Sequence, residues 1–205
     1  MLLSFTVFLT LFRATFASKL TDAAARGDLA AVEEMITQNH FSVDDIDDDD
    51  EESRTALIFA AVNGHPEVVN FLIRNKANVN HGDYHDFTPL MEASWRGHAE
   101  VVKILLLNKA ELERRAFGGT ALEFAVTKGY PDDDDDDDIL MNKYSDVVDL
   151  LLSSGANPIK VQDNEIVQKF FKKMEFFDFS SFAKNLPHIN GSLVEVIEET
   201  VKSAM

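Results

Sequence analysis

Carboxylates are the chemically active side chains that this sequence concentrates most. Seven consecutive aspartates run from Asp132 to Asp138, and eight acidic residues lie within residues 44–52. Calcium requires about six to eight oxygens that a turn holds at fixed positions, usually with a glycine and a bidentate glutamate. A run of a single residue type lacks that spacing. We therefore expect a hydrated spacer or an attraction for basic partners, with weak, diffuse cation binding as the alternative.

A second candidate for metal chemistry is the segment HGDYH, in which His81 and His85 flank Asp83. A zinc site needs a further organised ligand, and the sequence supplies none nearby, so we predict no metal site. The chain also has no phosphate-binding glycine loop, no nucleophilic serine elbow and no cysteine. We predict a protein that is not an enzyme and that needs no cofactor.

The net charge of −17 is concentrated in the two acidic tracts. Without their fifteen carboxylates, 36 − 15 = 21 acidic residues face 19 basic ones. The rest of the chain is nearly neutral and has no general basic surface. This excludes direct nucleic-acid binding of the usual electrostatic kind.

The elements that position these residues follow a repeat of about 33 residues. Thr55, Thr88 and Thr120 recur at this spacing, as do Gly64, Gly97 and Gly129, with a weaker copy around Gly27. Each threonine is an N-cap type, and Thr120 with Glu123 forms a capping box. Each glycine follows a short helix of small residues, as a C-terminal cap does. Second helices then begin at PEVVNFLI, AEVVKILLL and SDVVDLLL, the last from Asp146. Such helix pairs bury their apolar faces only by stacking.

The segment FTPLMEASWRGHAEVVKILLLNKA (residues 87–110) resembles the ankyrin repeat, and about four such units cover residues 18–158. The resemblance implies an all-α solenoid of stacked helix pairs with β-hairpin-like fingers between repeats. It also implies that His65 and His98, each following a glycine, are structural hydrogen-bonding residues. The repeats span about 18–50, 51–83, 84–116 and 117–158.

The two acidic tracts interrupt this repeat at different places. The first lengthens the finger before Thr55 by three residues. The second belongs to an insertion of thirteen residues between the two helices of the fourth repeat, within residues 131–144. Fingers and helix–helix turns lie at opposite ends of the helices, so the tracts should project from opposite edges.

The ends of the chain depart from the repeat. Residues 1–17 are apolar and form either a cleavable signal peptide or an extension that covers the first repeat, which we prefer because the repeats begin at Ser18. We expect residues 159–205, which carry six phenylalanines between Phe170 and Phe182, to form a helical cap. A phenylalanine-rich docking segment is the alternative.

The resemblance implies that partner contacts come from finger tips and from the ends of the first helices. These positions are Tyr84, His85, Phe87 and Phe117 on the fingers, and Val62, Asn63, Trp95, Arg96, Thr127 and Lys128 on the helices. The alternative for Phe87 and Trp95 is simple packing between repeats.

We predict a monomeric, non-catalytic scaffold or adaptor that binds another protein, one with a basic surface, through its concave face. The alternative function is a cation buffer or a chaperone of basic, histone-like proteins that acts through the aspartate tracts. We expect no membrane span and a location in the cytoplasm or nucleus, or secretion if residues 1–17 are cleaved.

Overall fold

The computed structural model describes residues 19–39, 42–46, 50–129 and 137–157. All regular secondary structure in these ranges is helical, which confirms the predicted fold class. A helix over residues 19–26 is followed by α2 (Leu29–Asn39), α3 (Ala56–Asn63), α4 (Pro66–Arg74), α5 (Pro89–Arg96), α6 (Ala99–Leu107), α7 (Ala121–Gly129) and α8 (Asp137–Ser153). The predicted N-terminal segment and C-terminal cap lie outside the described residues.

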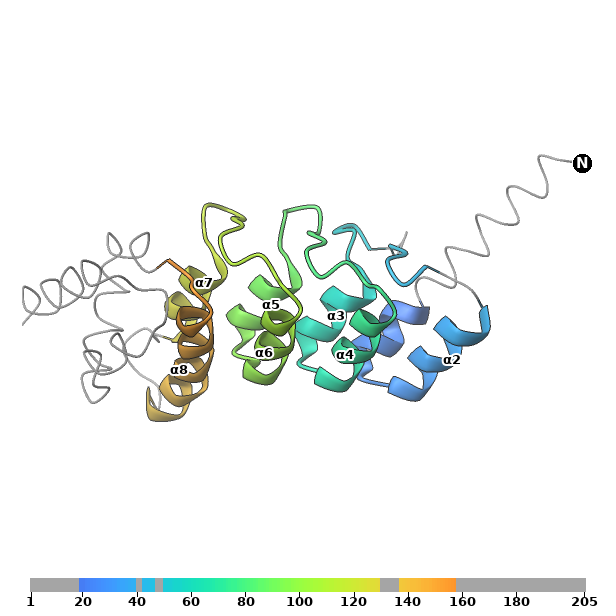
Figure 1. Cartoon of the computed structure of the whole chain (residues 1–205), viewed down its shortest axis with the longest axis horizontal. Coiled ribbons are helices and arrows are strands. Elements are labelled where there is room, and N and C mark those ends of the chain that lie inside the picture. The colour runs from blue at the N-terminus through green and yellow to red at the C-terminus, as the bar shows by residue number, and fades with distance from the viewer. Residues whose placement is uncertain (1–18, 40–41, 47–49, 130–136, 158–205) are drawn as a thin grey trace, which may run out of the picture.

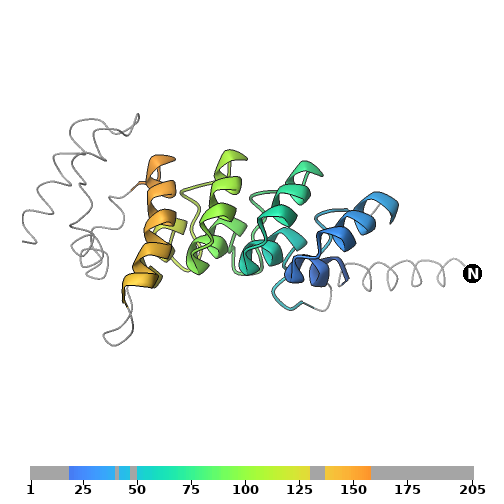
Figure 2. The same cartoon turned by 90° about the horizontal axis from the view of Figure 1, so that it is seen from below.

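The helices form a solenoid of stacked antiparallel pairs (Figure 1). The first helices α3, α5 and α7 pack in one row, and the second helices α2, α4, α6 and α8 pack in the other. Figure 2 shows the second row side by side, from blue α2 to orange α8. One apolar core runs through the stack and contains alanines where the first helices approach closely, including Ala60, Ala93 and Ala125.

The predicted caps fix the ends of the first helices. The hydroxyl oxygens of Thr55, Thr88 and Thr120 accept hydrogen bonds from the backbone N–H three residues later, at 3.3–3.4 Å. The capping box is present, because the Thr120 N–H donates to the Glu123 carboxylate. Gly64 and Gly97 end α3 and α5 in the left-handed region, with φ of 71° and 69°. The prediction differs from the structure in the fourth repeat, where Gly129 is the last residue of α7 rather than a cap that follows it.

A histidine on one repeat is bonded to the preceding repeat, as the resemblance implied. His65 Nε2 lies 2.9 Å from the carbonyl of Ala25, and His98 Nε2 lies 3.0 Å from that of Val62. Since a carbonyl only accepts, each Nε2 carries the hydrogen. A Cβ on Gly64 would lie 2.5 Å from His98 Nδ1. Glycine at this position therefore provides both the backbone turn and the space for the next histidine.

The fourth repeat makes the same bond with a different residue. Tyr144 occupies the histidine position, three residues before the first valine of the pair Val147-Val148, and its hydroxyl donates to the Trp95 carbonyl at 2.9 Å. Burial raises the pKa of Tyr144, more than the Arg96 charge lowers it. The hydroxyl therefore keeps its proton and donates.

The prediction that the second helix of the fourth repeat starts at Asp146 is wrong. Helix α8 begins at Asp137 and has 17 residues, whereas α4 and α6 have 9 each. The helix therefore begins at the last two residues of the aspartate run. The insertion is thus partly helical, and α8 begins at the edge opposite the fingers, as predicted (Figure 1).

The prediction of β-hairpin fingers is not confirmed. The described fingers contain isolated bridges, Ile46–Thr55 and Ala116–Gly119, rather than strands. Side chains connect successive fingers instead. In each case a side-chain oxygen on one finger accepts a hydrogen bond of 2.9 Å from a backbone N–H one repeat later, just after a second helix. The pairs are Asp44 with Asn78, Asn80 with Glu111, and Glu113 with Asn157.

The helices that the structure describes include none that is long and apolar enough to cross a bilayer.

Replacing Tyr144 tests whether the inserted helix is joined to the third repeat by this bond. We expect Tyr144→Phe to lower the free energy of unfolding by roughly 1 kcal/mol, because the Trp95 carbonyl loses its donor. Urea unfolding, followed by circular dichroism, measures the change. Tyr84→Phe removes the same atom from a side chain that is 75% exposed and should leave stability unchanged. Equal stability of Tyr144→Phe and wild type would contradict the role of the bond.

Candidate protein-binding surface

Six rings form a continuous aromatic cluster across the third and fourth repeats. Neighbouring ring centroids lie 5.0–6.2 Å apart, and the members are Tyr84, His85, Phe87, Trp95, Phe117 and Phe124. Tyr84 and Phe117 are 75% exposed, whereas Phe87 is 7% exposed. The cluster therefore has exposed tips on the fingers and a buried base between α5 and α7.

Hydrogen bonds within the third finger hold its exposed rings in place. The buried Asp83 carboxylate accepts from the N–H groups of His85 and Phe87, at 2.8 and 2.9 Å. The Tyr84 N–H donates to the Glu52 carbonyl at 2.8 Å, which ties this finger to the preceding one. The aromatic tips stand on a backbone that is already ordered.

Arg114 joins the third and fourth fingers. Its guanidinium donates to the Asn80 carbonyl at 3.0 Å and to the Asp86 carboxylate at 2.8 Å. Because Phe117 follows three residues after Arg114, this contact brings its ring within 5.1 Å of the His85 ring, measured between centroids. Two fingers thus present one surface.

Phe124 is the member that sequence reasoning missed. It stacks on Phe87 at 5.0 Å between centroids, and a Cβ on Gly119 would lie 2.9 Å from its ring. The signal was the Gly118-Gly119 pair, because a ring on the first turn of α7 needs a neighbour without a side chain. The preceding repeat has Glu92 at the equivalent position, which concealed the pattern.

Two cations flank the Trp95 ring. Lys128 Nζ lies 5.4 Å and Arg96 Cζ 5.9 Å from the ring centroid. These distances fit cation–π contacts, which stabilise exposed pairs by about 0.5–1 kcal/mol. Both cations stand at the C-terminal ends of first helices, α5 and α7, where the helix dipole also favours positive charge.

Seven of the ten predicted contact residues meet around this cluster. They are Tyr84, His85, Phe87, Phe117, Trp95, Arg96 and Lys128. Phe87 belongs to its base, where packing between repeats is its main contact. The exposed Thr127 hydroxyl donates to the Glu123 carbonyl at 2.7 Å. Val62 and Asn63 end α3, one repeat earlier, and Asn63 donates to the Phe59 carbonyl at 2.9 Å.

The first acidic tract contributes to the fold. Asp50 holds the Arg54 guanidinium with bonds of 2.7 and 3.0 Å and also accepts the Arg54 N–H. The Arg54 hydrogen bond keeps the pKa of Asp50 below its usual range. Arg54 in turn lies 4.6 Å above the Phe59 ring centroid. Residues 47–49 and 130–136 of the tracts lie outside the described residues.

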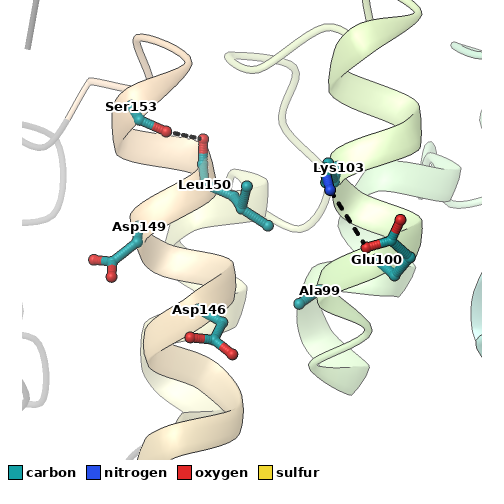
Figure 3. A pocket seen from close by; sticks show the side chains of 7 residues that line it. All are labelled: Ala99, Glu100, Lys103, Asp146, Asp149, Leu150 and Ser153. Carbon is teal, nitrogen blue, oxygen red and sulfur yellow. Dashed lines mark hydrogen bonds and ion pairs between the residues drawn. The ribbon is translucent and has the colours of Figure 1, made fainter.

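An open groove of about 400 Å³ lies between α6 and α8, on the second-helix row (Figure 3). Leu150 points from α8 toward α6, while Asp149 points away from α6. Burial raises the pKa of Asp149, and the Asp146 charge raises it further. Glu100 pairs with Lys103 at 3.7 Å. The groove is acidic, but its carboxylates do not converge on one point, and the described residues contain no cluster suited to a metal ion.

Glu92 lies beneath the cluster with its side chain 10% exposed. Burial raises the pKa of Glu92 above its usual range, although the Arg96 and Arg54 charges lower it. Its Oε2 lies 3.7 Å from Arg96 Nε and has no hydrogen-bond partner among the described residues. Few favourable contacts therefore offset the cost of burying the Glu92 carboxylate, and its charge does not face the solvent.

Comparison with known proteins supports the repeat assignment. Residues 20–116 match a family model described as ankyrin repeats in three copies. Ankyrin repeats are generally protein–protein interaction modules. The curated proteins gave no match to the chain.

Replacing Glu92 tests whether its buried negative charge lowers the stability of the fold. The pKa of Glu92 is higher in the folded than in the unfolded protein. Its contribution to stability is therefore full at a pH below the unfolded-state pKa, and it is lost as the pH rises through the folded-state pKa. We expect the stability of Glu92→Gln, relative to wild type, to increase between about pH 4 and pH 7. Urea unfolding at both pH values measures the difference. Glu34→Gln, at an exposed position in the middle of α2, should follow wild type at both. A pH-independent difference for Glu92→Gln would show that burial does not control its titration.

Proposed function

Because the chain is an ankyrin-repeat protein, we propose that it is a non-catalytic scaffold that binds another protein through the aromatic cluster and the cations beside it. The proposal rests chiefly on one observation: two finger-tip rings, each 75% exposed, are continuous with the Trp95 ring. Isolated apolar side chains are ordinary on a protein surface, but a contiguous exposed patch marks an interaction site.

The chemistry of the cluster suits a binding hot spot. Tryptophan, tyrosine and arginine are the residue types that dominate interface energies. Here Tyr84, Trp95 and Arg96 lie on neighbouring elements and share one surface. A partner that covers them would bury large rings with few rotatable bonds, so little side-chain entropy is lost on binding.

The ordered fingers strengthen the case. A loop that orders only on binding loses free energy at that step, whereas a preorganised loop does not. Asp83 and Arg114 already hold the third and fourth fingers in place. We propose that the protein acts as a monomer, in the cytoplasm or nucleus, with the cluster facing its partner.

Removing the two exposed rings tests this function. We expect Tyr84→Ala combined with Phe117→Ala to abolish capture of the partner and to leave the helical circular dichroism signal and the unfolding midpoint unchanged. Affinity capture followed by mass spectrometry identifies the proteins that wild type retains and the double variant loses. Leu107→Ala removes an apolar side chain that is also 75% exposed, at the end of α6, and should retain every partner. If the double variant retains the same proteins as wild type, the cluster is not the binding surface.

A second candidate function uses the acidic parts of the chain to attract a basic protein or to buffer cations. The acidic groove between α6 and α8 favours it, because Glu100 and Asp146 outnumber Lys103 there. Charge attraction of this kind falls steeply with salt.

Replacing Asp132 to Asp138 with asparagine and serine separates the two functions without changing the chain length. If the aromatic cluster is the binding surface, we expect partner capture to remain within about twofold of wild type. Loss of capture in this variant, with retention in the Tyr84→Ala and Phe117→Ala variant, would favour the acidic function instead. Quantitative mass spectrometry of captured proteins at low and high salt measures both.

A further inference from the structure

The electrostatics of the aromatic cluster point to a particular class of partner, and this inference rests on the proposed function. Arg96 and Lys128 both lie beside Trp95, within 5.9 and 5.4 Å of its ring centroid. Both side chains are exposed. In a chain of net charge −17, the exposed charges beside the Trp95 ring are therefore positive.

The carboxylates near the cluster are occupied by groups of the chain itself. Asp83 is buried and accepts two backbone N–H groups. Asp86 pairs with Arg114 at 2.8 Å, and Glu123 accepts from the Thr120 N–H and from Arg115. Glu92 is buried beside Arg96, at a long 3.7 Å. In contrast, no carboxylate of the described residues lies within ion-pair distance of Lys128.

A cation that stands over an aromatic ring keeps much of its charge available. Its contact with the ring uses the ring quadrupole and leaves its remaining donors free. Lys128 has three donors, and Arg96 has a fork that suits a carboxylate. Tyr84 and Phe117 supply an apolar surface at the finger tips, and the Phe87 ring connects that surface to the Trp95 ring beside these donors.

We propose that the partner binds through an acidic segment carrying an aromatic or large aliphatic residue. The apolar residue packs against Tyr84 and Phe117, and the flanking carboxylates pair with Lys128 and Arg96. The overall negative charge of the chain does not prevent this, because charges further than about 8 Å apart are largely screened at physiological salt. Lys128 and Arg96 therefore determine that the bound segment carries negative charge.

The experiment uses Trp95, the one tryptophan in the chain, as the reporter. Three short synthetic peptides are titrated into the full-length protein while tryptophan fluorescence is recorded. The first has a phenylalanine flanked by aspartates, the second has alanine in place of that phenylalanine, and the third has lysines in place of the aspartates. We expect the first peptide to give a saturable change at least about tenfold tighter than either of the others, since it alone satisfies the ring and both cations.

Substitutions then test the role of the cations. Lys128→Ala should weaken the acidic phenylalanine peptide by about two- to fivefold, as expected for an exposed ion pair. Arg96→Glu combined with Lys128→Glu should weaken it by more than about tenfold and favour the lysine peptide. The control Lys103→Glu reverses one positive charge on α6, in the other helix row, and should bind like wild type. Circular dichroism checks that each variant is folded.

The outcomes separate this inference from the proposed function. Preference of wild type for the lysine peptide, or an unchanged affinity in the Arg96→Glu and Lys128→Glu variant, would overturn the acidic-partner inference while the binding surface stands. If none of the three peptides changes Trp95 fluorescence, the inference fails. If Tyr84→Ala with Phe117→Ala also keeps every captured protein, the surface fails with it.

Discussion

The structure depends on one hydrogen bond that recurs between repeats. A side chain at the start of a second helix donates to the carbonyl two residues before the glycine that closes the first helix of the preceding repeat, as His65 does to Ala25 and His98 does to Val62. The donor lies over a glycine that could not carry a Cβ. The bond therefore sets the distance and the rotation between neighbouring pairs, and the apolar core follows from that stacking. In the fourth repeat Tyr144 makes the equivalent bond to Trp95.

The Tyr144 bond also explains why a long insertion is compatible with the fold. A longer connection costs little closure entropy, but the second helix must still return to its place. Helix α8 begins about two turns before Tyr144 and then presents the tyrosine at the position of the earlier histidines. A tyrosine is longer than a histidine, and it reaches the same kind of carbonyl from within a helix rather than from its N-cap. The fourth repeat thus keeps its register although its local sequence pattern is interrupted.

The sequence predicted the local contacts of this structure and missed contacts that join distant parts of the chain. Thr55, Thr88 and Thr120 were predicted because a cap is a local contact that depends on residues a few positions apart. Tyr144 and the start of α8 at Asp137 were not, because both depend on where the insertion allows the chain to return. Phe124 was missed for a related reason. The Phe124 ring stacks on Phe87, which lies 37 residues earlier in the chain. The repeat pattern did not reveal this contact, because the preceding repeat has Glu92 at the position of Phe124.

The distribution of charge leads to a different partner from the one that composition suggested. The sequence is strongly acidic, which favoured a basic partner. Asp44 and Asp50, however, bind groups of the chain itself, and the carboxylates around the aromatic cluster do the same. What a partner meets at that surface is Trp95 with Lys128 and Arg96 beside it. Because Tyr144 is bonded to the Trp95 carbonyl, the helix that begins within the aspartate run also contacts the residue at the centre of this surface. We therefore propose that the insertion supports binding through its helix and its hydrogen bond, and that two cations within 6 Å of the Trp95 ring select the partner's charge.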